Sequence, residues 1–298
     1  METERPNTVK GKTLRRRTKV ALAVALALAA AAALVASVPV TSVLNVLSGG
    51  APTVADVAYG TDPRQRYDVY RAGADAPVVV FVHGGSWDTG EKDMYRFVGN
   101  ALRKAGFTAV VVEYRLAPQT VFPGFVEDVA AAASHARRTV AGGAPVAIVG
   151  HSAGAQIAAL LAHDPRYLAA HGLSPCETFS GFVGLSGPYD FLPLDQARYK
   201  RIFPEASWAA SQPIAFAGNA GPPALLLHGT ADATVHAEDT TLMAAALADG
   251  GTHVRALLLD GVDHSDTIGA FGPGLAWLAP VREPVFRFLR ERAGRPGC

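Results

Sequence analysis

A serine flanked by small residues follows an apolar run near the middle of the chain. Residues 146–149 are Val-Ala-Ile-Val, the next five are Gly150-His151-Ser152-Ala153-Gly154, and an alanine-rich stretch fills 155–162. This order predicts a strand, a sharp turn and a helix, in which the small residues let the turn project the serine oxygen above a sheet. A serine hydroxyl is a weak nucleophile near neutral pH, so covalent chemistry at Ser152 needs a general base.

Two polar residues that follow later apolar runs are candidates for the base and the acid that orients it. Asp232 lies five residues beyond the run 224–227, and His264 lies five residues beyond the run 253–259. The order Ser, acid, His accompanies this kind of serine turn. We therefore predict that Asp232 orients His264 and that His264 accepts the Ser152 proton.

Two carboxylates close to the histidine are alternative acids. Asp263 and Asp266 are sequence neighbours of His264. Either would have to fold back to reach the far ring nitrogen of that histidine, so the prediction stays with Asp232.

Backbone donors for a developing oxyanion are predicted from two turns. One donor normally comes from the residue after the nucleophile, here Ala153. The others are expected after the run 78–82, where the sequence reads His83-Gly84-Gly85-Ser86-Trp87. Glycines allow the backbone to approach a substrate oxygen closely, so we predict Gly85 and Ser86 as donors, with Gly84 next.

The elements that must position these residues are visible as short, continuous apolar runs, which are typical of buried parallel strands. The runs cover 78–82, 108–114, 146–149, 182–185, 224–227 and 253–259. Between and after them, apolar residues recur at helical spacing over 94–105, 126–133 and 281–289. This alternation predicts an α/β fold with a doubly wound parallel sheet, helices on both faces and a ligand site at the carboxyl ends of the strands.

Five sequence elements in this order resemble the α/β-hydrolase superfamily, specifically its carboxylesterases, hormone-sensitive-lipase-like esterases and formamidase-like (BD-FAE-type) esterases. They are His83-Gly84-Gly85-Ser86-Trp87, Tyr114-Arg115-Leu116-Ala117-Pro118, Gly150-His151-Ser152-Ala153-Gly154, Asp232 and His264. Ser86-Trp87 replaces the third glycine of the hormone-sensitive-lipase pattern and is closer to the His-Gly-Gly-x-Trp form of formamidase-like and methylesterase-like members. The resemblance implies a mostly parallel, eight-stranded sheet and a carboxylic-ester hydrolase that forms an acyl-enzyme on small to medium acyl esters.

The resemblance leaves two alternative functions open. An amide or formamide hydrolase could use the same site. A non-catalytic binding scaffold on a hydrolase fold usually lacks a member of the catalytic triad, and none is missing here.

Substrate-contacting side chains are expected around the serine. We predict Trp87, His151 and Tyr189 in the substrate pocket, with packing as the alternative role of His151. The segment 187–222 separates two predicted strands and holds several aromatic residues. We interpret it either as a small lid whose aromatic side chains line an acyl or alcohol pocket, or as ordinary core beneath a surface helix.

Composition and motifs argue against other classes of protein. With 49% hydrophobic and 18% charged residues, the chain contains a large core. The remaining histidines show neither His-Glu-x-x-His nor cysteine spacing, and Gly84-Gly85 lacks the Gly-Lys-Ser/Thr ending of a phosphate loop. We therefore predict no metal, no cofactor and no nucleic-acid partner; the expected partner is a small-molecule ester, and the sequence leaves the oligomeric state open.

The first part of the chain is basic and then apolar. Residues 1–19 carry seven Lys or Arg against two Glu, and Val20–Val38 is apolar except for Ser37. We predict a cytoplasmic segment over 1–19, a transmembrane anchor or signal segment over 20–47, a linker over 48–54 and the hydrolase domain over 55–298. The basic flank then places the hydrolase domain outside the cytoplasm. It would be held at the cell membrane by a single pass, or secreted after cleavage of a signal peptide.

The chain has two cysteines, Cys176 and Cys298. Two are too few for a disulfide framework, and a chain terminus is a poor place to hold disulfide geometry. The sequence therefore predicts two unpaired thiols.

Overall fold

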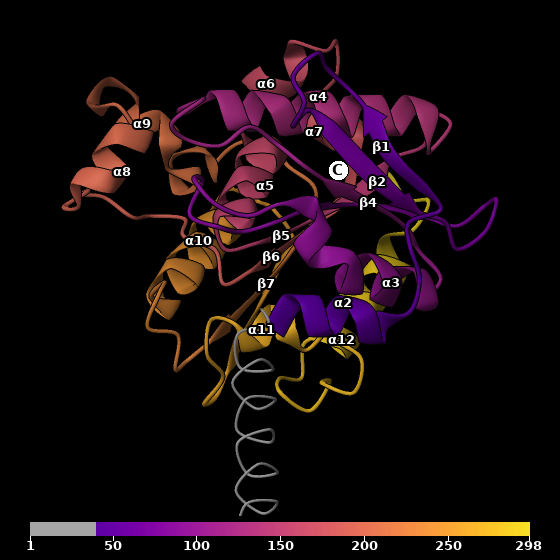
Figure 1. The fold of residues 1–298 in the computed structure, drawn as a ribbon. Helices are drawn as coiled ribbons and strands as arrows, with labels where there is room; N and C mark the ends of the chain where they lie inside the picture. Colours follow the sequence, from indigo (N-terminus) through magenta and orange to yellow (C-terminus); the bar gives the residue numbers. More distant parts are fainter. Residues whose placement is uncertain (1–39) are drawn as a thin grey trace, which may run out of the picture. The chain divides into compact units, whose positions relative to one another are not determined.

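A computed structural model describes residues 40–298. Residues 20–39 of the predicted anchor or signal segment therefore lie outside the described residues, whereas residues 40–47 lie within them. The centre of the fold is an eight-stranded sheet in the order β1-β2-β4-β3-β5-β6-β7-β8 (Figure 1). The strands are β1 (Val54–Ala58), β2 (Arg66–Tyr70), β3 (Val78–Val82), β4 (Thr108–Val112), β5 (Val146–His151), β6 (Phe179–Leu185), β7 (Ala224–Gly229) and β8 (Val254–Leu259). Strands β3 to β8 run parallel, and β2 is antiparallel to both β1 and β4. The predicted α/β fold with a mostly parallel sheet is confirmed.

The two antiparallel strands are the part of the sheet that the apolar runs did not reveal. Strand β1 is an edge strand whose residues are exposed or only half-buried, and β2 includes the charged residues Arg66 and Asp68. An edge strand with one neighbour needs no continuous apolar run, so the pattern that predicts buried parallel strands does not detect it.

Helices cover both faces of the sheet because side chains along each buried strand alternate between two cores. In β3, Val80 and Val82 belong to the first core, and Val79 and Phe81 belong to the second. The first core is closed by α4 (Gly124–Thr139), α5 (Ala153–His163) and α10 (Ala237–Asp249), and the second by α3 (Arg96–Lys104) and α12 (Arg282–Arg292). Every residue of α5 is buried, which explains why this helix is built mainly from alanine and leucine.

The parallel register brings the ends of the strands to one edge. Val82 of β3 pairs with Gly150 of β5, and Leu185 of β6 pairs with both His151 and Leu227. The turns after β3, β5, β7 and β8 therefore open on the same side of the molecule.

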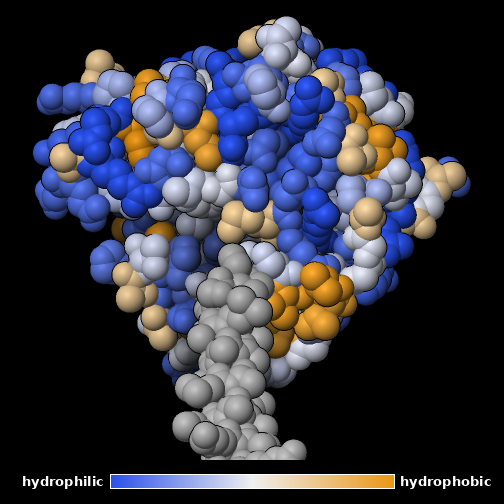
Figure 2. All heavy atoms as spheres, in the orientation of Figure 1, coloured by the Kyte–Doolittle hydropathy of each residue, from blue (hydrophilic) through white to orange (hydrophobic). Residues whose placement is uncertain are grey.

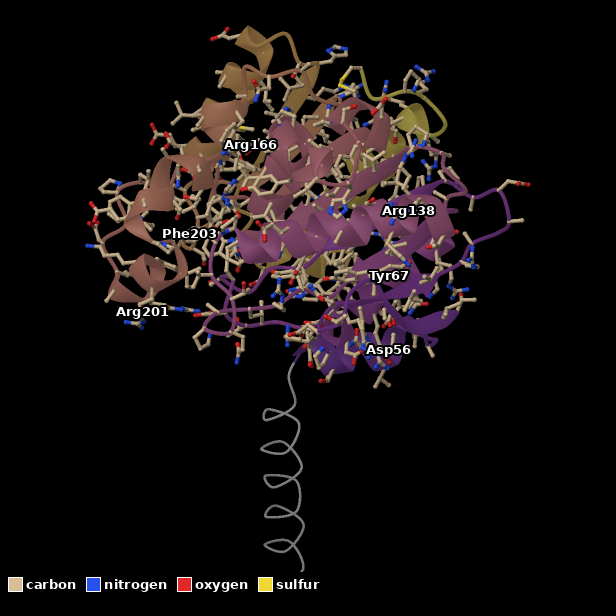
Figure 3. The ribbon with its side chains drawn as sticks, turned by 90° about the horizontal axis from the view of Figure 1, so that it is seen from above. Asp56, Tyr67, Arg138, Arg166, Arg201 and Phe203 are labelled. Atoms are coloured by element: carbon tan, nitrogen blue, oxygen red, sulfur yellow. A yellow bond between two sulfur atoms is a disulfide. The ribbon has the colours of Figure 1, made fainter. Side chains whose placement is uncertain are left out.

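The segment between β6 and β7 folds into two short helices, α8 (Ala197–Ile202) and α9 (Trp208–Ser211), with 3-10 turns beside them. In Figure 3, Arg201 lies at the outer edge of this segment and Phe203 on its inner side. Phe203 is fully buried, with its ring centroid 4.8 Å from that of Trp87 and 5.9 Å from that of Phe125 on α4. Part of the segment is therefore ordinary core, as one of the two interpretations predicts.

A helix precedes the sheet. Helix α2 (Val40–Ser48) buries Leu44, and its Asn45 side chain donates to the Asp93 carbonyl and accepts from the Phe97 N–H. These contacts belong to a compact unit that begins at Leu44. The compact unit thus begins before the predicted domain start at 55 and includes residues 44–47 of the predicted anchor or signal segment. It also includes the predicted linker 48–54, where the Gly50 carbonyl accepts from Asn100 and the Thr53 N–H donates to the Val69 carbonyl.

The outer side of α2 is apolar. Val46 and Leu47 are exposed there, and hydrophobic side chains gather over this helix in Figure 2. Across residues 40–298, no helix is both long enough and apolar enough to cross a membrane.

The prediction of two free thiols is wrong, because Cys176 and Cys298 form a disulfide with their Cα atoms 5.2 Å apart. The end of the chain is held in place for this bond. The Gly297 N–H donates to the Cys176 carbonyl at 3.1 Å, and Arg292 donates to the carbonyls of Ser180 and Pro296. These contacts supply the fixed geometry that a chain terminus does not ordinarily provide.

Candidate active site

The serine lies at the tightest turn of this edge. Ser152 connects β5 to α5 with φ 55° and ψ −125°, a conformation that side-chain-bearing residues rarely adopt. The two flanking glycines make the turn sterically feasible. A Cβ on Gly150 would overlap the Gly154 carbonyl, and a Cβ on Gly154 would overlap the Val82 carbonyl of the neighbouring strand.

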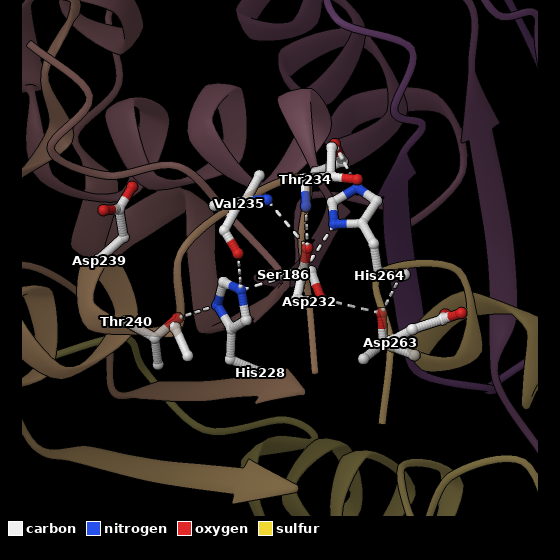
Figure 4. A network of polar contacts seen from close by, with 12 residues as sticks. Ser186, His228, Asp232, Thr234, Val235, Asp239, Thr240, Asp263 and His264 are labelled. Carbon is white, nitrogen blue, oxygen red and sulfur yellow. Dashed lines mark hydrogen bonds and ion pairs between the residues drawn. The ribbon is translucent and has the colours of Figure 1, made fainter. Parts of the chain in front are cut away.

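The structure brings Ser152, His264 and Asp232 together from three loops. His264 Nε2 is 2.9 Å from Ser152 Oγ. On the other side of the ring, His264 Nδ1 is 2.7 Å from Asp232 Oδ2 (Figure 4). Because the carboxylate can only accept, Nδ1 carries the ring proton and donates to Asp232. This leaves Nε2 unprotonated and able to accept from the serine hydroxyl.

Asp232 is held as a carboxylate by several donors. Its Oδ1 accepts from the N–H groups of Thr234 and Val235, each at 2.9 Å. Burial alone would raise the pKa of Asp232, but hydrogen bonds from His228, His264 and the Val235 N–H outweigh burial and lower that pKa far below its usual range. Asp232 is therefore negatively charged at neutral pH.

The alternative acids bind elsewhere. Asp263 Oδ1 accepts from the N–H groups of Ser265 and Asp266, and Asp266 Oδ2 accepts from the Asp263 N–H. Both carboxylates cap their own turn, whereas the contact with the His264 ring belongs to Asp232.

A second histidine, which was not predicted from the sequence, contacts the acid. The fully buried His228 places its Nε2 3.1 Å from Asp232 Oδ2 and 3.0 Å from the Val235 carbonyl. Its position in the sequence could have indicated this contact. His228 lies at the carboxyl end of β7, four residues before Asp232, and so at the edge of the sheet that carries the site.

The predicted oxyanion donors do not all occupy the same place. Ser86 and Ala153 line the cavity in front of Ser152, whereas Gly84 and Gly85 do not. Within residues 40–298, the N–H groups of Gly85, Ser86 and Ala153 donate to no other protein group, so they are available to a ligand. Gly84 instead acts as a spacer, since a Cβ there would lie 3.0 Å from the Ser152 Cβ.

The turn after β3 is braced from behind by His83. The His83 carbonyl accepts from the Tyr114 hydroxyl at 2.8 Å, and its ring Nδ1 lies 2.7 Å from the Gly84 carbonyl. Burial lowers the pKa of His83 to about 4, so the ring is neutral and Nδ1–H donates to that carbonyl. Glu113 lies behind the ring, and burial raises the pKa of its carboxyl group to about 7. His83 thus supports the backbone and does not line the cavity.

A cavity of ≈230 Å³ opens in front of the serine. Its lining residues come from the turn after β3, from the serine turn, from the segment after β6 and from the loop after β7. They are Ser86, Trp87, Ser152, Ala153, Pro188, Phe191, Pro193, Leu194, Asp195, Gln196, Tyr199, Thr234 and Val235. The aromatic residues of the segment after β6 therefore serve both of the predicted purposes: Phe191 and Tyr199 line the cavity, and Phe203 is core.

Of the three predicted pocket residues, only Trp87 lines the cavity. Its indole N–H donates to Gln156 Oε1 at 3.0 Å, which fixes the ring in the wall. Tyr189 is a correction: its side chain is fully buried against Gly184 and Gly187.

His151 does not line the cavity and takes the packing role that was its alternative. Its Nε2 lies 3.2 Å from the His264 carbonyl. Burial lowers the pKa of His151 to about 3, so it packs there as a neutral ring. In the part of the chain that the structure describes, no group of three or more His, Cys, Asp or Glu residues is arranged to hold a metal ion.

The sheet order, the serine turn and the Ser-His-Asp contacts define an α/β-hydrolase. The chain belongs to the BD-FAE family within that class, whose family model matches residues 67–247. Among similar curated proteins, a probable isoprenylcysteine alpha-carbonyl methylesterase ICMEL1 of Oryza sativa subsp. japonica is 31% identical over 242 residues, which cover 70% of this chain and 56% of that protein. Esterase LipC of Mycobacterium tuberculosis is 32% identical over 209 residues, which cover 61% of this chain and 52% of LipC. The chain thus spans about half the length of these relatives.

Solved structures share the fold. The carboxylesterase EstE1, cloned from a metagenomic library, matches with a TM-score of 0.70 at 19% identity, covering 85% of this chain and 94% of EstE1. An esterase B from Lactobacillus rhamnosis, solved with a tributyrin phosphonate inhibitor, also matches with a TM-score of 0.70, at 18% identity and covering 92% of this chain and 94% of that chain.

Proposed function

We propose that the protein is a serine carboxylic-ester hydrolase in which Ser152 is the nucleophile, His264 the general base and Asp232 the acid that orients it. The observation that carries the proposal is the double contact of His264. One ring nitrogen meets the Ser152 hydroxyl at 2.9 Å and the other meets Asp232 at 2.7 Å, while the serine faces a cavity. The esterases among the curated relatives support the same chemistry.

The reaction follows from this geometry. Ser152 Oγ attacks the ester carbonyl as its proton passes to His264 Nε2, and Asp232 stabilises the resulting imidazolium. The N–H groups of Ser86 and Ala153, with Gly85 beside them, stabilise the oxyanion. His264 then gives the proton to the departing alcohol, and the acyl group stays on Ser152.

The second half-reaction uses the same groups. Water attacks the acyl-enzyme while His264 takes a proton from it, the carboxylic acid leaves, and Ser152 regains its hydrogen. No step calls for a metal or an organic cofactor.

The cavity favours short, uncharged acyl groups. Its ≈230 Å³ lies below the roughly 300–1,000 Å³ typical of sites for drug-sized ligands. Trp87, Phe191 and Tyr199 give it apolar walls.

The test is hydrolysis of p-nitrophenyl acetate, butyrate, octanoate and palmitate by the wild type and by Ser152→Ala. Ser134→Ala is the matched control, because Ser134 is also a buried serine but lies on α4, where it pairs with Arg138. We expect the short esters to be cleaved by the wild type and the control, and not by Ser152→Ala. Equal rates in Ser152→Ala and the wild type would exclude this nucleophile, and faster cleavage of a matched p-nitroanilide would redirect the proposal to amides.

We further infer that the hydrolase unit lies outside the cytoplasm, held by the apolar segment 20–38 or released by its cleavage. The basic residues before that segment and its length of about 28 Å as a helix support this location. The Cys176–Cys298 disulfide supports it too, because disulfides persist mainly in oxidising compartments.

Protease treatment of intact cells tests this location. Degradation of the hydrolase unit without lysis is expected, and complete protection until lysis would contradict export. N-terminal sequencing of the mature protein then distinguishes a retained anchor from a cleaved signal.

A further inference from the structure

Two imidazoles meet the same oxygen of the acid. His228 Nε2 is 3.1 Å from Asp232 Oδ2, and His264 Nδ1 is 2.7 Å from that oxygen (Figure 4). The two rings come from different elements, β7 and the loop after β8. The charge on one carboxylate oxygen is therefore divided between two donors.

The contacts of His228 determine where its proton lies. Its Nε2 faces two acceptors, Asp232 Oδ2 and the Val235 carbonyl at 3.0 Å, so Nε2 must carry the proton. Its Nδ1 is 2.7 Å from Thr240 Oγ1, whose hydroxyl can donate to it. A neutral ring thus satisfies all three contacts in a site that is fully buried.

The Asp232 carboxylate is also held by donors other than His228. Asp232 Oδ1 is already held by the N–H groups of Thr234 and Val235. The His228 contact therefore changes how much charge Oδ2 presents to His264, and has less effect on where Oδ2 lies.

We propose that His228 is a positioning residue that acts on His264 through Asp232. By donating to Oδ2, His228 reduces the negative charge that this oxygen presents to His264, and so weakens the attraction of the carboxylate for the imidazolium that forms during catalysis. The inference rests on the proposed role of His264 as the base.

Besides Asp232, the titratable groups that face His228 and His264 come from two neighbouring elements. They are His151 on β5 and Asp239 on α10. The carboxylate of Asp263, in the loop that carries His264, accepts hydrogen bonds from the backbone of its own turn. The variants below leave all of these groups in place.

Two substitutions separate the donor from the bulk of the ring. In His228→Asn the amide can reach Thr240 but cannot reach Oδ2, whereas in His228→Gln the longer amide can donate to Oδ2. We expect the acidic limb of the kcat/KM profile for p-nitrophenyl butyrate to rise by about one pH unit in His228→Asn. This means about tenfold lower activity below the limb and little loss on the alkaline plateau. His228→Gln should return the limb toward its wild-type position.

One control variant tests whether any buried histidine has the same effect, and one further variant removes the donor in another way. His163→Asn also replaces a buried histidine with asparagine, but His163 lies on α5 against Gly221 and Phe182, so the limb should not move. His228→Leu has no donor at all and gives a second measurement of the same shift if His228→Asn fails to fold.

A readout independent of turnover is the pKa of His264, followed by NMR titration of the full chain. It should rise in His228→Asn by the same amount as the limb and return in His228→Gln. An unchanged His264 pKa, or a loss of activity that is equal at every pH in both variants, would reduce His228 to a packing residue and overturn the proposal. If the wild type cleaves no ester, the proposed function fails, while the titration still decides the role of His228.

Discussion

Replacing both cysteines by serine should destabilise the protein substantially. The Cys176–Cys298 bond closes a loop with a sequence separation of 122 residues. In the chain-entropy model, a loop of this length restricts the unfolded chain by an amount worth at most about 5 kcal/mol at 25 °C. For a domain of this size, such a loss lowers the thermal midpoint by roughly 10–20 °C.

The assay is thermal unfolding followed by circular dichroism, with and without a phosphine reductant. The reductant should lower the wild-type midpoint to that of Cys176→Ser/Cys298→Ser and should leave the variant unchanged. Below its midpoint the variant should keep its esterase activity, since Cys176 precedes β6 and the site lies at the opposite ends of the strands. Two titratable thiols in the unreduced, denatured wild type would show that the disulfide is absent, and equal midpoints for the two proteins would show that it does not stabilise the fold.

Three further substitutions test packing, specificity and titration. Gly154→Ala places a Cβ against the Val82 carbonyl and should lower the free energy of unfolding, measured by urea titration, by about 3 kcal/mol or more. In the control Gly73→Ala, the new Cβ meets no atom within 4 Å and should cost little. Similar losses of stability in the two variants would contradict the close packing at the serine turn. Tyr199→Ala enlarges the cavity and should raise kcat/KM for octanoate relative to acetate about tenfold, and an unchanged ratio would remove Tyr199 from the acyl pocket. Burial lowers the pKa of His163 to about 4, so the unfolded chain binds its proton near pH 6.5 while the folded chain does not, and stability falls as the pH drops through this window. His163→Leu should remove one proton from this dependence, which is about 1.4 kcal/mol per pH unit between roughly pH 6 and 4.5, and identical slopes would argue against a buried neutral ring.

The parallel part of the fold could be predicted from sequence because each buried strand is a continuous apolar run. The run at 78–82 matches β3 residue for residue, and the run at 224–227 lacks only the last two residues of β7. The antiparallel strands could not be predicted in this way. Strand β1 is an exposed edge strand that needs no apolar side chains, and the buried strand β2 includes Asp68, whose charge is paired with Lys92. Helix α2 was missed because the stretch 40–47 carries no charge, which suits the end of a membrane segment as well as a helix that buries Leu44.

Part of the site could also be predicted from the sequence, and part could not. Ser152, Asp232 and His264 could be proposed because each follows a predicted strand, and parallel strands bring such residues to one edge. Tyr189 was predicted in the pocket but is core, whereas His228 had no predicted role but contacts the acid. Chain order does not reveal which side chains turn toward the core. Tyr189 packs under Gly184 and Gly187, while His228 reaches the acid. The disulfide depended on contacts made by Arg292, which no spacing of cysteines could reveal.

The central claim is that Ser152 carries the acyl group. The most direct measurement is intact-mass and peptide mass spectrometry after brief mixing with p-nitrophenyl butyrate, or with an alkyl phosphonate that cannot be hydrolysed further. We expect one added group per chain, located on the peptide that contains Ser152 and absent from Ser152→Ala. An adduct on another residue, or rapid ester hydrolysis by the wild type with no adduct from either reagent, would contradict it.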